Sequence, residues 1–435
     1  MSDFSAIGEE MHALARRLWP IPRSLTGDGV RQTLAILKEH VPELQIHEVP
    51  SGTPCFDWLL PQEWNCRDAW IETPQGEKIC RFTENNLHVL GYSEPVDRTL
   101  TLDELQAHLF SIPELPTAIP YVTSYYRRTW GFCMTQQQRD TLAEGTYRVV
   151  IDSELKDGHL TYADLVIPGE TEDEVLLSTY VCHPSMANNE LSGPCVTIHL
   201  AKWLKSLPKR NKTYRLVFIP ETIGSICYLS RHLAHLKKYV KAGFIVNCIG
   251  DERAYSFMPS RDGTTMSDRV GEAVMKQIAP DYKWYSFLER GSDERQYCYP
   301  GVDLPIASLM RSKYAEYPEY HTSLDDLDFV TAKGLQGGFD LFRQVLEVID
   351  SNRTLRNTVL CEPQLGKRGL YANTSTRDIG LTALDIVNVL AYCDGKTDLF
   401  EVSQRIKLPY WKVNKMAQDL EAHQLLVLAD ANEAL

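Results

Sequence analysis

Five polar side chains stand where apolar runs of the sequence end, and their types suit the binding of a metal ion. They are His183, Glu221, Asp251, His321 and Asp325. If the runs are strands of an open α/β sheet, these side chains lie beyond the carboxyl ends of the strands, where such sheets bind their ligands. Two imidazoles together with carboxylates suit Zn²⁺ and leave one coordination position open for water. The joint occurrence of these residues favours a zinc site that activates water.

The residues around these points predict the elements that would position the site. Strand-like and helical runs alternate, which is typical of a sheet covered by helices on both faces. The expected strands are 174–180, 214–219, 242–249 and 304–309, and the expected helices are 193–207, 225–239 and 334–349. Before them, 147–151 and 158–167 read as neighbouring strands. The first fifty residues contain two amphipathic helical runs separated by the polar loop 23–29.

Two further regions differ from this core in amino-acid composition and in expected secondary structure. Residues 51–146 are rich in aromatic residues and prolines and contain short β-like runs, so we expect a separate, mostly β inserted domain. Residues 352–435 read as three helices followed by a short strand, which is typical of a winged helix; the expected helices are 382–392, 399–406 and 410–423, and the strand is 425–429. The predicted organisation is a core of 1–50 and 147–350, the insert 51–146, and a winged-helix domain. The length of 435 residues agrees with roughly three domains.

The charge balance limits the partners that the chain would bind. Lys plus Arg is 45 and Asp plus Glu is 58, a net charge of −13, which argues against a general nucleic-acid or anionic-membrane binder. The region 352–435 has 10 basic and 10 acidic residues, whereas modules that read DNA are usually basic. We therefore expect the winged helix to contact a protein or to act as a lid, and DNA is the less favoured partner.

The sequence also predicts a cytoplasmic protein. No window approaches the roughly 18 uncharged apolar residues of a membrane span. The first residues lack the basic stretch and apolar run of a secretory signal. The 11 cysteines form no CxxC pair, which fits reduced thiols better than a disulfide framework.

Several motifs together resemble a known family. They are His-Pro-Ser at 183–185, Ala-Asn-Asn-Glu-Leu-Ser-Gly at 187–193, Pro-Glu-Thr-Ile-Gly-Ser at 220–225, Gly-Ser-Asp-Glu-Arg-Gln at 291–296, Tyr-His-Thr-Ser-Leu-Asp at 320–325 and Pro-Arg-Ser-Leu-Thr-Gly at 22–27. The chain resembles, over nearly its whole length, the zinc aminopeptidase fold of the M28 peptidase family. Within it, the resemblance is to a subgroup with an inserted domain and a C-terminal winged helix, often labelled polysaccharide biosynthesis proteins with an aminopeptidase-like domain. This implies an α/β fold with a mixed sheet flanked by helices.

The resemblance assigns roles to four positions. It implies that His183 and His321 are metal ligands and that Glu221 is the general base, which takes a proton from metal-bound water. The Asp of a Ser-Asp pair before the last strand matches Asp293, which the resemblance makes a substrate-binding or supporting residue.

Three positions depart from the family pattern. The metal-bridging Asp is replaced by Asn189, the second metal-binding Glu by Thr222, and an Asp after the third strand by Cys248. A neutral amide is a weak zinc ligand, and Glu190 next door has a longer reach. These departures favour one zinc over two, held by His183, Glu190 and His321, with Asn189, Asp251 and Asp325 as additional or supporting residues.

The resulting hypothesis is a zinc-dependent, aminopeptidase-like hydrolase of a peptide or amide bond in a small substrate. Zinc polarises the scissile carbonyl and lowers the pKa of its water to about 7, and Glu221 passes the proton to the leaving nitrogen. Asp293 or Glu294 would hold a free amine. Arg295 or Arg23 would instead hold a carboxylate or stabilise the oxyanion, although Arg23 could equally form an interdomain salt bridge.

Other readings of the sequence stay open. The aromatic insert, with the segment 121–126, could roof the site and fix specificity. A non-peptidase amide or acyl enzyme of glycan or secondary-metabolite assembly is an alternative on the same scaffold. A non-catalytic, metal-binding regulatory protein whose winged helix meets a partner is the third. Oligomeric state is left undecided.

Overall fold

The computed structural model describes residues 4, 6–370 and 383–429. The chain forms two compact units, Met1–Arg343 and Gln344–Leu435. The boundary between the units falls inside helix α9 (Ala332–Ser351).

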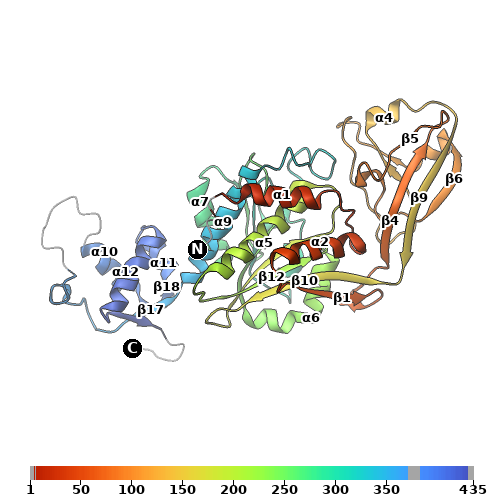
Figure 1. Ribbon diagram of the computed structural model, residues 1–435. Helices are drawn as coiled ribbons and strands as arrows, with labels where there is room; N and C mark the ends of the chain where they lie inside the picture. Colours follow the sequence, from red (N-terminus) through yellow and green to blue (C-terminus); the bar gives the residue numbers. More distant parts are fainter. Residues whose placement is uncertain (1–3, 5, 371–382, 430–435) are drawn as a thin grey trace. The chain divides into compact units, whose positions relative to one another are not determined.

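Within the described residues, a mixed eight-stranded sheet forms the centre of the first unit (Figure 1). In spatial order its strands are β1 (Gln45–Pro50), β10 (His159–Ile167), β12 (Thr213–Ile219), β11 (Glu174–Tyr180), β13 (Val240–Ile245), β16 (Ile306–Met310), β14 (Ser256–Met258) and β15 (Lys283–Trp284). Strands β12, β11, β13 and β16 run parallel. Strand β10 pairs antiparallel with β1 and β12, and β14 pairs antiparallel with β16 and parallel with β15. Every residue of β11 is buried, which explains its apolar centre, because a strand covered on both faces cannot alternate with polar residues. The predicted mixed α/β architecture is confirmed.

Helices cover the sheet on both faces. They are α1 (Gly8–Leu18), α2 (Asp28–His40), α5 (Ser192–Ser206), α6 (Ile223–Tyr239), α7 (Met266–Ile278) and α9. Figure 1 shows α1, α2 and α5 on one side of β1 and β10, and α6 on the other. Gly193 lets α5 approach the sheet closely, since a Cβ atom there would lie 2.3 Å from both Thr179 Oγ1 and Val246 O. The helix therefore packs directly on the strands that lead into the site.

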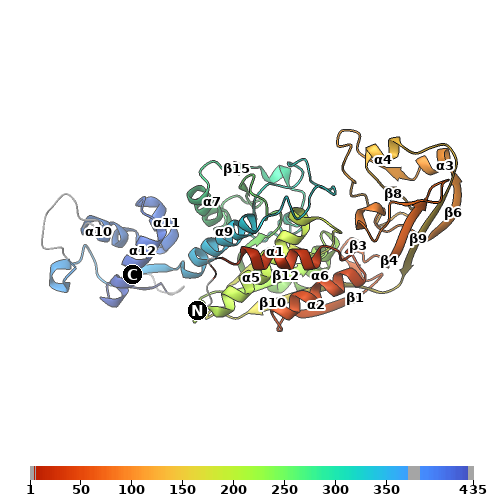
Figure 2. The same cartoon turned by 45° about the horizontal axis from the view of Figure 1, so that its top comes forward.

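The insert has a sheet of its own, in a stretch that the structure describes throughout. Its strands, in spatial order, are β5 (Lys78–Ile79), β4 (Glu63–Glu72), β9 (Thr146–Lys156) and β6 (Val96–Thr101). Two short helices, α3 (Leu102–Gln106) and α4 (Gln136–Asp140), lie beside this sheet (Figure 2). One hydrophobic cluster runs from the insert into the core and includes Ile71, Phe132, Val217 and Ile219. The insert is thus packed on the core rather than tethered to it.

Strand β9 differs from the expectation. The sequence pattern predicts that the core resumes at residue 147 and that 147–151 and 158–167 are neighbouring strands. In the structure, β9 pairs with β4 and β6, while β10 pairs with β1 and β12. Strands β9 and β10 therefore belong to different sheets, and the insert's sheet extends to Lys156.

The described part of the second unit packs three helices against a three-stranded antiparallel sheet. Its elements are β17 (Thr354–Asn357), α10 (Ala383–Tyr392), β18 (Asp394–Asp398), α11 (Leu399–Arg405), α12 (Tyr410–Ala422) and β19 (Leu426–Leu428). Leu355, Val389, Val402 and Val413 belong to its core. The three expected helices and the last strand are present, β17 and β18 were not anticipated, and Thr382, expected at the start of the first helix, lies outside the described residues.

Two general features of the chain bear on its surroundings. None of the helices in the described ranges combines the length and the apolar character needed to cross a lipid bilayer. All eleven cysteines are free thiols.

Candidate active site

A cavity of about 340 Å³ lies at the carboxyl ends of β11 and β12 in the first unit. Four of its lining residues carry a carboxylate, a guanidinium or an imidazole, and we call them the pocket group: His183, Glu221, Arg295 and His321. Its other lining residues are Leu25, Trp58, Tyr121, Thr123, Tyr125, Tyr126, Cys182, Thr222 and Ile223. The aromatic segment 121–126 therefore forms part of the wall, as the sequence suggested. Trp58 also comes from the aromatic insert, whereas Leu25 and Cys182 were not expected there.

The loops that carry the site contain strained backbone. Four non-glycine residues at strand ends have positive φ angles: Ser185 (36°), Thr222 (62°), Cys248 (46°) and His321 (56°). Side chains with a Cβ rarely adopt this region, and such conformations persist where the surrounding structure imposes them, often at functional sites.

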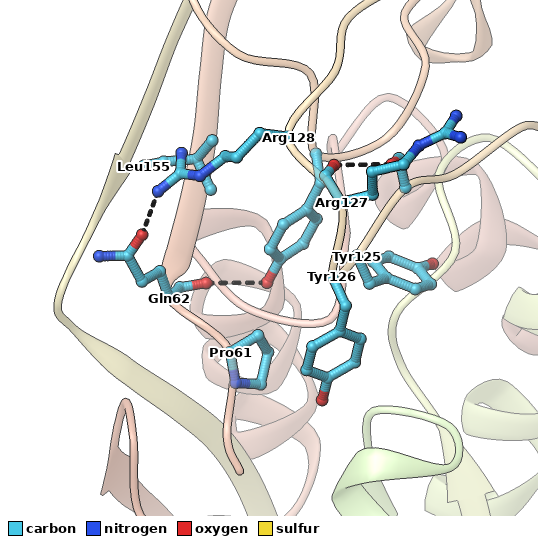
Figure 3. Close-up of a pocket in the computed structure, with 9 residues that line it drawn as sticks. Pro61, Gln62, Tyr125, Tyr126, Arg127, Arg128 and Leu155 are labelled. Atoms are coloured by element: carbon cyan, nitrogen blue, oxygen red, sulfur yellow. Dashed lines mark hydrogen bonds between the residues drawn. The ribbon is translucent and has the colours of Figure 1, made fainter. Parts of the chain in front are cut away.

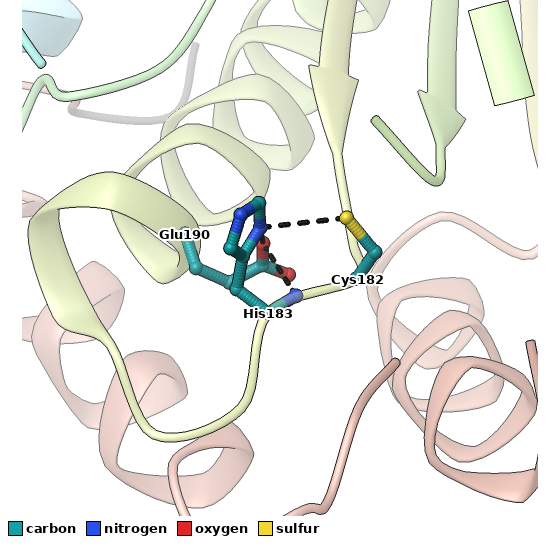
Figure 4. Close-up of side chains that lie close together, drawn as sticks. All are labelled: Cys182, His183 and Glu190. Atoms are coloured by element: carbon teal, nitrogen blue, oxygen red, sulfur yellow. Dashed lines mark hydrogen bonds and ion pairs between the residues drawn. The ribbon is translucent and has the colours of Figure 1, made fainter. Parts of the chain in front are cut away.

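His183 is buried and held from one side. Its Nδ1 lies 3.1 Å from Glu190 Oε2 and 3.4 Å from the sulfur of Cys182 (Figure 4). Its Nε2 lies 3.6 Å from Glu221 Oε2. When Nδ1 donates its proton to Glu190, Nε2 presents a lone pair towards Glu221, which is the usual way in which a carboxylate orients a metal-binding imidazole. Burial works against the charged imidazolium, but Glu190 and Glu221 outweigh it and raise the pKa of His183.

His321 approaches the pocket from the loop after β16. Its ring stacks on Tyr320 at a centroid distance of 3.9 Å and stands edge-on to Tyr121 at 5.1 Å. The centroids of its ring and that of His183 are 5.5 Å apart. Within the described chain, the buried Nε2 of His321 has no hydrogen-bond partner. Burial, with a smaller contribution from His183, lowers the pKa of His321 to about 3, so this imidazole is neutral at pH 7.

Glu221 stands on the tight turn between β12 and α6. Its backbone N–H donates to Cys182 Sγ at 3.2 Å, and its side chain is 21% exposed. The next residue, Thr222, donates its N–H to Asp293 Oδ1 at 2.7 Å, which holds the turn in its strained conformation. Burial raises the pKa of Glu221, although His183 opposes this. The result is a carboxylate suited to take up a proton.

Asp293 and Glu294 are buried behind the pocket instead of lining it. Asp293 Oδ1 also accepts a hydrogen bond from Ser225 Oγ at 2.8 Å. Glu294 Oε1 accepts from two backbone N–H groups, of Gly291 and Ser292, and from the Tyr314 hydroxyl at 2.7 Å. Burial and then the charge of Glu221 raise the pKa of Asp293 to about 7. One oxygen of each carboxylate fixes the surrounding loops, and the other oxygen has no hydrogen-bond partner in the described chain. Neither residue lines the cavity, where the sequence suggested that one of them binds an amine.

Arg23 is an internal residue of the core. It is 1% exposed and donates to the carbonyl oxygens of His183 at 3.0 Å and Leu18 at 2.7 Å. Its Nε lies 3.4 Å from Glu190 Oε1. Arg23 therefore pairs with the carboxylate that orients His183, and the expected interdomain bridge or substrate contact is not what the structure shows.

A second set of polar residues, also at the strand ends, is closed to the cavity, and we call it the buried network: Asn188, Asn189, Asp251 and Asp325. Asp325 accepts the N–H groups of Asn188 at 2.6 Å and Asn189 at 2.9 Å, and the Tyr317 hydroxyl at 2.9 Å. Burial nevertheless raises the pKa of Asp325 to about 6.

The other members of the buried network are engaged through their side-chain oxygens, and Asn189 Nδ2 has no hydrogen-bond partner in the described chain. Asp251 accepts the N–H and the hydroxyl of Ser312, at 2.9 and 2.8 Å, and the side-chain amide of Asn188 at 3.0 Å. Asn189 Oδ1 accepts the Tyr180 hydroxyl at 3.1 Å. Burial, together with Asp325 and Asp251, raises the pKa of the Cys248 thiol well above its usual value. Carboxylates engaged in this way have little capacity left for a metal ion.

Two sets of donor atoms around His183 could hold a metal ion. The residues in the described chain whose ligand atoms all lie within 4.8 Å of one another are Cys182, His183 and Glu190 (Figure 4), and His321 is outside this group. Glu190 already pairs with Arg23, and burial keeps the pKa of Cys182 far above the range of a thiolate ligand. The unpartnered Nε2 of His321 and the outward Nε2 of His183 form the chemically more suitable pair of ligand atoms, and the Glu221 carboxylate lies beside them. The trio expected from the sequence is therefore divided, with Glu190 behind His183 and His321 across the cavity.

A smaller cavity of about 170 Å³ shares Tyr125 and Tyr126 with the first (Figure 3). Arg128 donates there to Gln62 Oε1, and the Tyr92 hydroxyl donates to Gln62 O at 3.1 Å. Its polar groups are thus largely paired among themselves, which distinguishes it from the first cavity.

Comparison with known proteins gives two family matches. The family described as domain of unknown function (DUF4910) matches residues 12–352, and a winged helix-turn-helix family matches residues 353–428. A relative from Clostridium acetobutylicum is 43% identical over 426 residues, which cover 98% of this chain and 97% of the relative. Its name describes a candidate polysaccharide biosynthesis protein with aminopeptidase-like domain.

Solved structures agree with these matches. The crystal structure of a candidate peptidase from Clostridium acetobutylicum has a TM-score of 0.91 at 43% identity and covers 98% of this chain and 97% of its own. A zinc aminopeptidase from Bacillus subtilis has a TM-score of 0.55 at 13% identity, over 79% of this chain and 95% of its own. A peptidase M28 precursor from Shewanella amazonensis has the same TM-score and identity, over 83% and 97%. The last two likenesses concern the fold alone. The expected resemblance to the M28 zinc aminopeptidase fold, with a C-terminal winged helix, is confirmed.

Proposed function

Because the chain belongs to the family described as domain of unknown function (DUF4910), and its fold is that of zinc aminopeptidases, we propose that it hydrolyses a peptide or amide bond. One observation carries the proposal. The Glu221 carboxylate lies 3.6 Å from His183 Nε2, in a cavity that His321 also lines. A carboxylate beside two imidazoles in a pocket of this kind is a suitable arrangement for activating water.

Glu221 is the proton carrier in this proposal. Its carboxylate takes a proton from the water that attacks the scissile carbonyl carbon, and a C–O bond forms. Glu221 then gives the proton to the nitrogen as the C–N bond breaks, so the products are a carboxylic acid and an amine. The raised pKa of Glu221 supports both halves of this role, since the protonated form must persist until the nitrogen accepts the proton.

A single zinc ion fits the donors of the pocket. The residues that would hold it are His183 and His321, with Glu221 beside it, and Glu190 would orient His183 through Nδ1. When bound, zinc supplies a Lewis acid that polarises a carbonyl and acidifies water. The names of the distant structural relatives support zinc as the metal.

A second candidate function rests on the name of the Clostridium acetobutylicum relative. That name refers to polysaccharide biosynthesis, and Asn189, Thr222 and Cys248 stand where the resemblance predicted further metal ligands. Both points favour an amide or acyl enzyme of glycan assembly on the same scaffold over a general peptidase. The two candidates use the same pocket and differ in the substrate.

The winged helix and the cellular compartment complete the proposal. For the winged-helix region 352–435 we propose a protein partner, which is supported by its neutral charge and by Trp411 on α12, whose exposed fraction is 64%. The free cysteines support a reducing compartment such as the cytoplasm.

Zinc content and turnover together test the function. We expect one zinc per chain by elemental analysis in the wild type, a loss of zinc in His183→Ala and in His321→Ala, and full zinc in the control His423→Ala. Glu221→Gln should keep its zinc and lose hydrolysis of a panel of peptides, aminoacyl amides and N-acyl amino acids. Loss of zinc in Glu221→Gln would make Glu221 a ligand and overturn its role as base. A wild type that binds no zinc after reconstitution and cleaves no member of the panel would overturn the hydrolase.

A further inference from the structure

We propose that Arg295 binds a carboxylate of the substrate, so that the amide cleaved in this pocket carries a free carboxylate instead of a free amino terminus. The inference rests on the proposed function and names its substrate class, the N-acyl amino acids and related amide acids. The charges that line the cavity carry it.

A substrate amine would need a free carboxylate among the residues that line the pocket. Among the lining residues, Glu221 is the carboxylate, and it is already committed to the proton transfer beside His183. Asp293 and Glu294 are each 1% exposed and do not line the cavity. One oxygen of each accepts hydrogen bonds from backbone N–H groups and hydroxyls behind the wall, and Asp293 Oδ2 and Glu294 Oε2 are buried there without a hydrogen-bond partner in the described chain. A substrate ammonium would therefore find no second carboxylate in the cavity, although charged groups in a pocket need an opposite partner.

A substrate anion would instead find a cation, Arg295, in the wall of the pocket. Arg295 lines the cavity and donates from Nη2 to the hydroxyl of Thr222, the residue after Glu221. Its Nε is buried without a hydrogen-bond partner, and in the described chain no carboxylate lies within 4.0 Å of its guanidinium. A planar guanidinium with unused donors is the group that binds carboxylates in a bidentate manner. The Thr222 hydroxyl accepts one hydrogen bond from the guanidinium, and the remaining N–H groups of Arg295 are available to a ligand.

Aromatic side chains form another part of the cavity wall. Trp58, Tyr121 and Tyr126 line the same cavity as Arg295. Trp58 also lines an adjoining cavity of about 500 Å³ with apolar residues such as Ile226 and Leu229. The charged end of a substrate is thus expected at Arg295 and an apolar acyl group along the aromatic side, with the amide between them near Glu221 and His183.

Binding can be measured apart from catalysis. The probes are N-benzoyl amino acids, each paired with the neutral amide of the same compound, and aminoacyl amides with a free amine. Calorimetric titration of Glu221→Gln should give binding of the acids that is about 10- to 100-fold tighter than that of their amides, the range of a hydrogen bond to a charged group. Adding Arg295→Gln should remove the difference, Arg295→Lys should restore part of it, and the exposed control Arg290→Gln should leave it unchanged.

The outcomes separate this inference from the hydrolase itself. If the acids bind through Arg295 but the wild type does not cleave them, the substrate class stands and the hydrolysis fails. If the wild type cleaves amides but prefers the free amines, or if Arg295→Gln weakens acids and amides equally, the role of Arg295 is overturned. Failure of the acids to bind at millimolar concentration overturns it as well.

Discussion

The pocket group and the buried network both lie beyond the carboxyl ends of one sheet, yet their polar atoms are used differently. In the buried network, both oxygens of Asp251 and of Asp325 accept hydrogen bonds. In the pocket group, His321 Nε2 and Arg295 Nε have no partner in the described chain. Buried polar groups are normally paired, so unpaired ones beside a cavity point to a ligand. Position at a strand end identifies candidates. Unmet hydrogen-bonding capacity at the wall of a cavity, and not inside the core as at Asn189 Nδ2, separates the functional ones from the structural ones.

The sharpest test of this comparison is Glu221→Gln, with the largest expected effect. We expect kcat on the substrate found by the panel to fall about 1,000-fold, within the range for loss of a general base. The thermal unfolding midpoint should stay the same or rise slightly, because burial already disfavours the charge of Glu221. Steady-state kinetics and calorimetry measure the two quantities, with the exposed Glu144→Gln as control. A large loss of stability would show that Glu221 belongs with the structural residues.

A substitution in the buried network should lower the stability of the protein and leave its catalytic activity nearly unchanged. Asp251→Ala leaves the donors of Ser312 and Asn188 buried without partners, and each such group costs about 1–3 kcal/mol. We expect the free energy of unfolding to fall by about 3 kcal/mol in urea titrations, while kcat per folded molecule changes less than about threefold. The exposed Asp281→Ala is the matched control. A variant of normal stability that has lost its activity would move Asp251 into the functional set.

The pH dependence of stability gives a smaller effect. Burial raises the pKa of Asp325 to about 6 in the folded chain, above the usual value of about 3.9. The folded state thus holds this proton more tightly, so the contribution is complete below about pH 4 and is lost as the pH rises through 6. From pH 4.5 to 7, the free energy of unfolding should decline by about 2 kcal/mol more in the wild type than in Asp325→Asn. Parallel pH profiles of the two proteins would contradict a raised pKa at Asp325.

The sequence predicted those parts of the fold that local pattern determines. Strands β11 and β12 are buried, and buried parallel strands form apolar runs that stand out in the sequence. Strand β9 was recognised but placed in the wrong sheet, because its apolar residues do not reveal which strand lies beside it. The short turn between β9 and β10 redirects the chain from one sheet to the other.

The candidate site was predictable to a similar degree. Residue types at strand ends pointed to His183, Glu221 and His321, which line one cavity in the structure. The direction of Asn189 and Glu190 was not predictable, since the π-helix Ala187–Leu191 shifts the side chains relative to an ordinary helical turn. A buried arginine at position 23 is equally hard to foresee, because arginine is mostly exposed in proteins.

The smallest expected effect belongs to Asn189→Asp, which restores one carboxylate that the resemblance predicted. The Tyr180 hydroxyl can still donate to it, and the buried Nδ2 that it replaces has no hydrogen-bond partner in the described chain. The neighbouring Cys248 stays protonated, because burial raises its pKa, and the Thr222 hydroxyl stays bound to Arg295. We therefore expect elemental analysis to give the same zinc content in the variant and the wild type, and kcat to change little. One additional zinc per chain would contradict this, and it would mean that the buried network is a metal site that lacks a single ligand.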